Sequence, residues 1–313
     1  MYACSSDWSP DWIPEQDLTL VLNQLSGKVE ASPYGSNRVS LNHGLHFTGG
    51  EPFLNFELLA KAVEIANELG IPSTFVETNC YWCTEDETTR EKLTLLRNKG
   101  LKGILISVNP FYLEYIPFNR TERAIRIGQE VFPRNVMVYQ VEYYLQFKEL
   151  GIKKTLALDE YLEMVELDDL QRRVELFLMG RAAYKLKDFY PKYKAGHFFH
   201  KPCQPPFLRS WHNHIDNYGN YLPGYCGGIS LGDARNLDLI CQEGIDADSH
   251  PILKFLAAAD FEGLFHFATE DFGYEEKSEG YVSKCHLCLD IRKHLAKQGF
   301  EELAPKEFYS HLE

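Results

Sequence analysis

The sequence predicts an α/β protein with a parallel sheet, followed by a smaller region that is rich in cysteine. From residue 44 onward, short apolar runs alternate with segments whose apolar residues repeat at helical spacing. Repeated strand–helix units imply parallel strands that are joined by right-handed crossovers. Such an array forms either an open doubly wound sheet or a full or partial barrel, and ligands bind at the carboxyl ends of the strands in both.

The first strand–helix unit begins at residue 45. Leu45–Thr48 is a short apolar run that ends in two glycines, and Leu54–Leu69 then places its apolar residues on one helical face. Gly70 ends this helix, and Pro72 precedes a second predicted strand, Ser73–Thr78.

The next unit predicts a helix over Glu87–Lys99, ended by Gly100, and a strand over Gly103–Val108. This strand is a continuous apolar run, which is typical of a strand that is covered on both faces. A helix follows from Asn119 to Phe132, with Asn119 as its N-cap and Glu122 three residues later in a variant of the capping box.

The remaining elements are a strand over Val136–Val141, a helix over Leu158–Leu167 and a last short strand over Val174–Leu178. A helix is also predicted over Glu15–Leu25, but no strand precedes it. Near residue 196 the composition changes to one rich in His, Cys, Gly and turn residues. We therefore expect one domain over 1–195 and a second domain over 196–313.

Composition excludes several classes of protein. Hydrophobic residues make up 44% and charged residues 25% of the 313 residues, which excludes wholesale disorder. The net charge of −13 argues against nucleic acid or an anionic membrane as partner. No stretch approaches the ~18 apolar residues that a membrane helix needs, and no secretory signal is visible at the start.

The most distinctive segment, HFTGGEP, runs from His46 to Pro52 just after the first predicted strand. Gly49 and Gly50 let the backbone approach a ligand closely and leave its amide and carbonyl groups exposed. The Glu51 carboxylate beside them could pair with a cationic group of a ligand, such as an amino group. An ordinary strand-to-helix turn explains the same residues equally well.

FTGGEPFL resembles the GGEP motif of the radical S-adenosylmethionine (SAM) enzymes, and the resemblance extends to about residue 180. It implies a partial (β/α)6 barrel of the TIM type, here without its first strand. In that family the motif holds the amino group of the methionine moiety through backbone carbonyls and the Glu. The contacts with SAM that the resemblance implies are Gly49, Gly50, Glu51, Pro52, Asn79, Ser107 and Arg181.

The family's CxxxCxxC loop, whose thiolates hold a 4Fe–4S cluster that cleaves SAM, is absent from the chain. Only Cys4 precedes Cys80. We expect that the chain begins at an internal methionine and that Cys4 is the last ligand of this radical cluster, because loss of a central strand would leave an unpaired sheet edge. The alternative is a degenerate relative that cannot hold the cluster.

Four of the eight cysteines form a second pattern. Cys203 and Cys226 flank a hairpin that is predicted over 211–223. Cys285 and Cys288 form a CxxC that opens a helix predicted over Leu289–Gln298. Four thiolates suit tetrahedral zinc or a 4Fe–4S cluster, although four unrelated buried thiols remain the alternative. The pattern resembles the Twitch form of the SPASM domains, which implies an auxiliary 4Fe–4S cluster with these four ligands.

Cys80 and Cys83 form another CxxC, at the end of the second predicted strand. Thiols at this place either contact a substrate, exchange disulfides or fill the core as small buried side chains.

Together, these resemblances predict an enzyme that cleaves SAM reductively to a 5′-deoxyadenosyl radical, which abstracts a hydrogen from a substrate. Relatives with such a C-terminal domain modify peptides or proteins, and the electron donor is expected to be a flavodoxin or ferredoxin. Oxygen-sensitive clusters predict a cytoplasmic location. The alternatives are a non-enzymatic, degenerate barrel that binds a metal or ligand through its cysteine-rich cap, and an aldolase-like barrel with GGEP by coincidence.

Overall fold

The computed structural model describes residues 7–165, 179–201 and 212–312. The chain divides into two compact units. One comprises Leu25–Leu176, and the other comprises Met1–Gln24 together with Phe177–Glu313.

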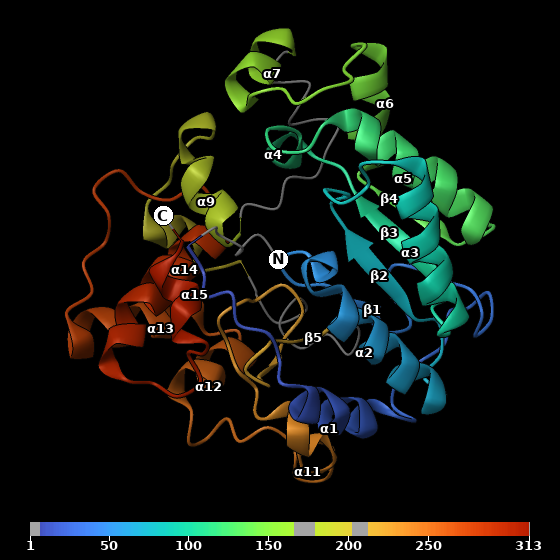
Figure 1. Ribbon diagram of the computed structural model, residues 1–313. Helices are drawn as coiled ribbons and strands as arrows, with labels where there is room; N and C mark the ends of the chain where they lie inside the picture. The colour runs from blue at the N-terminus through green and yellow to red at the C-terminus, as the bar shows by residue number, and fades with distance from the viewer. Residues whose placement is uncertain (1–6, 166–178, 202–211, 313) are drawn as a thin grey trace. The chain divides into compact units, whose positions relative to one another are not determined.

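The Leu25–Leu176 unit contains a four-stranded parallel sheet in the order β1-β2-β3-β4 (Figure 1). Its strands are β1 (His46–Phe47), β2 (Phe75–Thr78), β3 (Gly103–Ser107) and β4 (Val136–Tyr139). The predicted α/β class with parallel strands is therefore confirmed. The further strand predicted over 174–178 lies outside the described residues.

Short helices lie between the strands and after β4. They are η1 (Pro52–Asn55), α2 (Phe56–Glu68), α3 (Asp86–Asn98), α4 (Pro110–Leu113), α5 (Phe118–Val131), α6 (Val141–Glu149) and α7 (Leu158–Met164). The helix predicted from Leu54 begins instead at Phe56, because the Asn55 side chain accepts a hydrogen bond from Leu58 N (3.2 Å) and caps α2. The expected N-cap Asn119 is wrong, since α5 already begins at Phe118, after Pro117.

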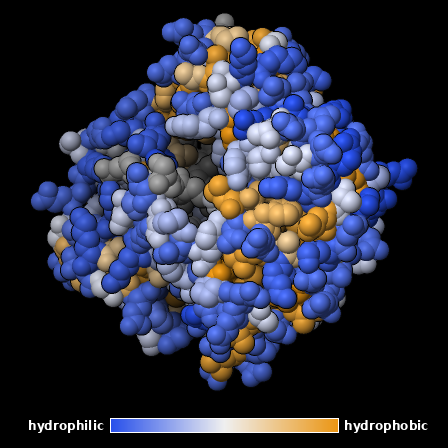
Figure 2. Space-filling view, viewed as in Figure 1, coloured by the Kyte–Doolittle hydropathy of each residue, from blue (hydrophilic) through white to orange (hydrophobic). Residues whose placement is uncertain are grey.

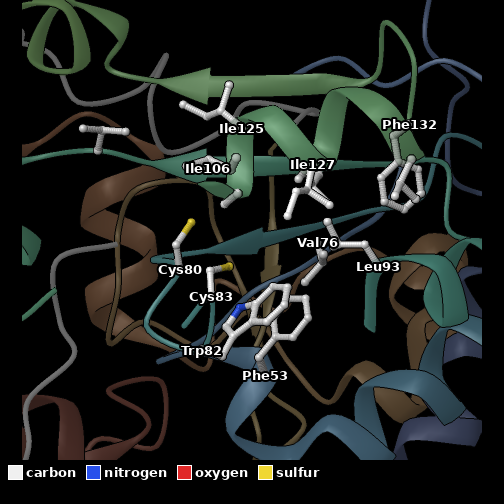
Figure 3. Close-up of a cluster of buried hydrophobic side chains, with 14 of the residues drawn as sticks. Phe53, Val76, Cys80, Trp82, Cys83, Leu93, Ile106, Ile125, Ile127 and Phe132 are labelled. Atoms are coloured by element: carbon white, nitrogen blue, oxygen red, sulfur yellow. The ribbon is translucent and has the colours of Figure 1, made fainter. Parts of the chain in front are cut away.

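One face of the sheet is covered by helices. Val76, Ile104 and Ile106 point to this face and pack in one core cluster with residues of α2, α3 and α5 (Figures 1 and 3). Every residue of β3 is buried, as its apolar run predicted. Alternation along a strand sends the intervening residues to the opposite face.

That opposite face changes in character along the strands. Near their amino ends, Phe75 and Leu105 pack with Val39 in a small apolar cluster. At their carboxyl ends, Glu77 and Ser107 occupy the same rows and are polar. Helices of this unit thus cover one face, while polar groups collect on the other at the edge where the strands end.

The described residues of the second unit form mainly short helices that pack around a hydrophobic core. It contains α1 (Glu15–Leu25, to its Gln24), α9 (Arg181–Lys185), α11 (Leu237–Glu243), α12 (Pro251–Ala257), α13 (Phe261–His266), α14 (Lys284–Leu295) and α15 (Lys306–Ser310). Strands β5 (His214–Ile215) and β6 (Tyr221–Leu222) pair antiparallel, which confirms the predicted hairpin. Gly219 at its tip has a φ of 86°.

Helix α14 begins earlier than the sequence predicts. Ser283 caps it by accepting a hydrogen bond from His286 N (3.0 Å), so that Cys285 and Cys288 lie inside its first turns rather than before it. No helix in the described part of the chain is long and apolar enough to cross a membrane. The face shown in Figure 2 is largely hydrophilic, with apolar residues in scattered patches.

Candidate functional site

The carboxyl ends of β1, β2 and β3 carry a row of hydrogen-bonded polar side chains. Glu77 at the end of β2 lies in the middle of this row. Thr48 Oγ1 donates to Glu77 Oε2 (3.0 Å), and Ser107 Oγ donates to Glu77 Oε1 (2.5 Å). Thr48 follows β1, Glu77 lies in β2 and Ser107 ends β3, so the pairing of these neighbouring parallel strands brings them together.

Directly after β1, the GGEP turn is fastened to the end of β2 by Glu51. This carboxylate is only 4% exposed and accepts hydrogen bonds from Phe53 N (3.2 Å), Asn79 N (2.7 Å) and Thr78 Oγ1 (3.0 and 3.1 Å). Because these groups satisfy both of its oxygens, Glu51 holds the turn in place. The hydrogen bonds of the Glu51 carboxyl group are therefore made within the protein, and its first role is structural.

The Thr78 hydroxyl has its hydrogen bonds fixed by its surroundings. Its oxygen accepts from Cys80 N (3.0 Å) and Trp82 Nε1 (3.0 Å), which occupies both lone pairs. Its single proton must therefore point to Glu51. The Trp82 ring stacks on Phe53 with centroids 3.9 Å apart, so the polar network and the adjacent aromatic pair support one another (Figure 3).

Burial raises the pKa of Glu51 to about 7, against the opposing effect of its hydrogen bonds from Asn79, Phe53 and Thr78, while the nearby Glu77 adds to the rise. The usual value is 4.5. Glu51 therefore changes its protonation state near neutral pH.

The two glycines of the turn are its exposed part. Gly49 has a φ of 140°, which side chains rarely permit, and Gly50 is exposed with no atom within 4 Å of the position that a Cβ would take. Pro52 opens η1 and is buried. The structure therefore separates the motif into a buried anchor, Glu51 and Pro52, and an exposed stretch of backbone, Gly49 and Gly50.

The other predicted contacts with SAM lie in different settings. The Asn79 amide joins the Glu51 network, and its side-chain Oδ1 accepts from Tyr81 N (3.0 Å). Ser107 is held by Glu77 at the end of β3. Arg181 is the first residue of α9 and belongs to the other compact unit. Asn79 and Ser107 thus share one sheet edge with the GGEP turn.

Two residues of this edge were named by the sequence only within longer segments, without a role of their own. His46 in β1 stacks on Phe75 with centroids 5.2 Å apart, and Glu77 links Thr48 to Ser107. Burial lowers the pKa of His46, and Glu77 partly opposes the shift. The period-2 alternation of His46 and Thr48 around Phe47 could have revealed this polar row.

Cys80 and Cys83 are buried between the sheet and its helices (Figure 3). Burial raises the pKa of Cys80 well above its usual value, and the neighbouring Cys83 adds to the rise. A thiol without access or thiolate character is a poor nucleophile. The structure therefore favours the interpretation of these thiols as core side chains.

In the C-terminal unit, a buried arginine joins two of the predicted metal ligands. Arg292 lies on α14 one helical turn after Cys288. Against the opposing effect of burial, Tyr309, Cys288 and Cys226 raise its pKa. Its Nη1 also donates to Gly227 O (2.8 Å), next to Cys226 in the chain. Cys285 lies one helical turn before Cys288 on the same side of α14. Arg292 thus joins the loop after the hairpin to α14, the helix that contains the CxxC.

A buried cation favours the thiolate form of a neighbouring cysteine, but Cys226, Cys285 and Cys288 do not by themselves form a group that could hold a metal ion. Cys203 and Cys4, the other predicted ligands, lie outside the described residues. Within 7–165, 179–201 and 212–312, no three His, Cys, Asp or Glu side chains are grouped closely enough to hold a metal ion.

Comparison with known proteins leaves the family open. No protein-family model matches the chain, and no curated protein matches its sequence.

Proposed function

We propose that the chain is a relative of the radical SAM enzymes. In this proposal the sheet belongs to a partial (β/α)6 barrel, SAM binds at the carboxyl ends of β1, β2 and β3, and Cys203, Cys226, Cys285 and Cys288 hold an auxiliary 4Fe–4S cluster. The arrangement of helices on one face of the sheet, with polar groups on the other, supports the barrel, since a barrel interior carries its ligand groups on the face without helices.

The observation that carries the proposal is the anchored turn. Glu51 fixes the turn by accepting hydrogen bonds from three residues. Gly49 and Gly50 remain exposed, with open space at the position that a Gly50 Cβ would take. A backbone that is held in place and has no side chains can offer its carbonyl groups to an ammonium group without rearrangement.

The resemblance gives Glu51 a direct contact with the amino group of SAM. Its hydrogen bonds instead favour an indirect role, in which Glu51 orients the turn and the carbonyl groups of the turn hold the ligand. Ser107 and Thr48 are oriented by Glu77 and can hydrogen-bond to a ligand at the same edge. A bound 4Fe–4S cluster would supply the electron for reductive cleavage of SAM.

A variant of Gly50 tests the binding of SAM. The full chain is titrated with SAM by calorimetry under anaerobic conditions, and Gly50→Val is compared with wild type. Apart from its two chain neighbours, a Cβ at this position meets no atom within 4 Å. The variant should therefore fold normally and lose at least about tenfold in affinity through collision with the ligand. Wild type that does not bind SAM, or a variant with equal affinity, would contradict the proposal.

Iron content tests the C-terminal centre separately. After anaerobic reconstitution with iron and sulfide, Cys285→Ala with Cys288→Ala should lose the iron that wild type binds, while Cys241→Ala, at an exposed thiol, should retain it. Unchanged iron in the double variant would refute the ligand assignment.

The second candidate function is a degenerate barrel that binds a ligand or metal without catalysis. The engagement of Glu51 within the fold favours it, because a turn held in this way also suits simple binding. Incubation with SAM and dithionite separates the two candidates in one direction. Release of 5′-deoxyadenosine would refute the binding protein, whereas intact SAM is expected both of a binding protein and of a chain without the CxxxCxxC loop.

A further inference from the structure

The loop that follows β2, residues 79–83, is bonded to the GGEP segment at two points. Asn79 N donates to Glu51 Oε2 (2.7 Å), and the Tyr81 hydroxyl donates to Phe53 O (3.3 Å). Within the loop, Tyr81 N donates to Asn79 Oδ1 (3.0 Å), which links the two points to each other. The position of the turn therefore depends on the position of this loop.

Two arginines of α5 hold the 79–83 loop from its other side. Arg120 Nη1 donates to Tyr81 O, and Arg123 Nη1 donates to Cys83 O (2.7 Å). Arg123 is also engaged by Asp86, which accepts a hydrogen bond from its Nε (2.9 Å). Among the described residues, Arg120 forms no ion pair, and Tyr81 O is the acceptor that its side chain contacts.

Every carbonyl group from residue 80 to residue 83 has a donor. Cys83 N donates to Cys80 O (3.1 Å), and Thr84 N donates to Trp82 O (2.8 Å). The two arginines supply the donors for the other two carbonyl groups. A carbonyl group that is removed from water without a partner is costly, so the arginines belong to the hydrogen bonding that fixes the loop.

The loop depends on these bonds because it contains a strained residue. Cys80 has a φ of 69°, a left-handed conformation that is uncommon for a residue with a side chain. Such a conformation persists only where the surrounding structure holds it. Loss of the Arg120 donor would leave Tyr81 O without a partner and would let the loop relax away from Glu51.

We propose that Arg120 is a positioning residue of the SAM-binding edge, which holds the 79–83 loop and, through the loop, Glu51 and the exposed glycines of the turn. The inference rests on the proposed function. Arg120 acts through the loop and is not itself a contact of the ligand. A turn that is held before binding loses little freedom when the ligand arrives, whereas a mobile turn must be ordered by the ligand, which lowers affinity.

The first measurement is hydrogen exchange of the full chain without ligand, followed by mass spectrometry of its peptides. Arg120→Met keeps the length of the side chain but removes the donor, and Arg120→Lys keeps a cationic N–H donor. The amides of Phe53 and Asn79, which donate to Glu51, should exchange at least about tenfold faster in the Met variant than in wild type. The Lys variant should exchange like wild type.

Arg126→Met is the matched control on the same helix. Arg126 pairs with Asp86 (2.7 Å) and Glu130 (3.6 Å) and forms no hydrogen bond with the described 79–83 loop. This variant should leave the exchange of the two amides unchanged. A general loss of stability would speed exchange in β3 as well, so the amides of β3 should keep their wild-type rates in all three variants.

The second measurement is affinity for SAM by calorimetry under anaerobic conditions. Arg120→Met should bind SAM at least about fivefold more weakly than wild type, because the ligand must then order the turn. Arg120→Lys and Arg126→Met should bind it with the affinity of wild type.

Faster exchange that is confined to the two amides, together with weaker binding of SAM, would support the inference. Unchanged exchange in Arg120→Met, exchange that rises equally throughout the unit, or wild-type affinity in that variant would overturn it. Wild type that does not bind SAM would overturn the proposed function, and the exchange rates alone would then decide whether Arg120 positions the turn. If Arg120→Met does not fold, Arg120→Gln, which is polar but shorter, repeats both measurements.

Discussion

Replacing Thr78 with Val removes one buried hydroxyl and leaves the shape of the side chain almost unchanged. That hydroxyl donates to Glu51 (3.0 Å) and accepts from the Cys80 amide and the Trp82 indole (3.0 Å each). The substitution therefore leaves two buried N–H groups without an acceptor and deprives the carboxylate of one donor.

The expected loss follows from these bonds. Each unsatisfied buried donor costs about 1–3 kcal/mol, so the two donors make Thr78→Val lower the free energy of unfolding by about 2–6 kcal/mol. The matched control is Thr78→Ser, which keeps all three hydrogen bonds and loses one methyl group, at a cost of about 0.8 kcal/mol. The difference between the two variants isolates the polar network.

Urea unfolding followed by tryptophan fluorescence provides the assay. Trp82 is the only tryptophan of the Leu25–Leu176 unit, and the others are Trp8, Trp12 and Trp211. Changing those three to Phe in every protein makes the signal specific to this unit. Valine and serine variants that agree within about 0.5 kcal/mol would refute the role given to the hydroxyl.

Two further predictions concern the same turn. Burial raises the pKa of Glu51 from 4.5 to about 7, so between these two pH values the folded chain holds a proton that the unfolded chain releases. Binding of this proton stabilises the folded state. The stabilisation is full below pH 4.5 and is lost as pH rises through 7. Between pH 5 and 8 the free energy of unfolding should fall by about 2.5 kcal/mol more in wild type than in Glu51→Gln, and parallel urea curves at the two pH values would contradict this. Gly49→Ala, at a φ of 140°, should lower the free energy of unfolding by about 1–3 kcal/mol in the same assay. Gly50→Ala should change it by less than about 0.5 kcal/mol. Equal effects of the two substitutions would contradict the strain at Gly49.

The sequence predicted most of the parallel sheet, because apolar runs between glycine and proline signals are local features. It missed α6, since Val141 continues the apolar run of β4 and hides the point where the strand ends. In the structure Gln140 adopts a left-handed conformation with a φ of 63°, and the helix starts at the next residue. Its buried face, Tyr143 and Phe147, has helical spacing but is too short to distinguish from a loop.

The site was predicted only in outline for a different reason. The pattern identifies Glu51 as important, but the groups that bury it, Thr78 and Asn79, lie 27 and 28 residues further along the chain. Only the register of two strands brings them together. Arg292 gave no signal at all, because an arginine in the last turn of a helix is ordinarily a solvated residue that complements the helix dipole.

The buried thiols of Cys80 and Cys83 can report how fast the parallel-sheet unit opens. Both side chains have no exposed surface, whereas Cys241 in the other unit is exposed. A maleimide added to the native protein should therefore label Cys241 at once, and label Cys80 and Cys83 only at the rate at which their unit opens. Mass spectrometry of the labelled peptides would measure the rate of this opening without an engineered probe.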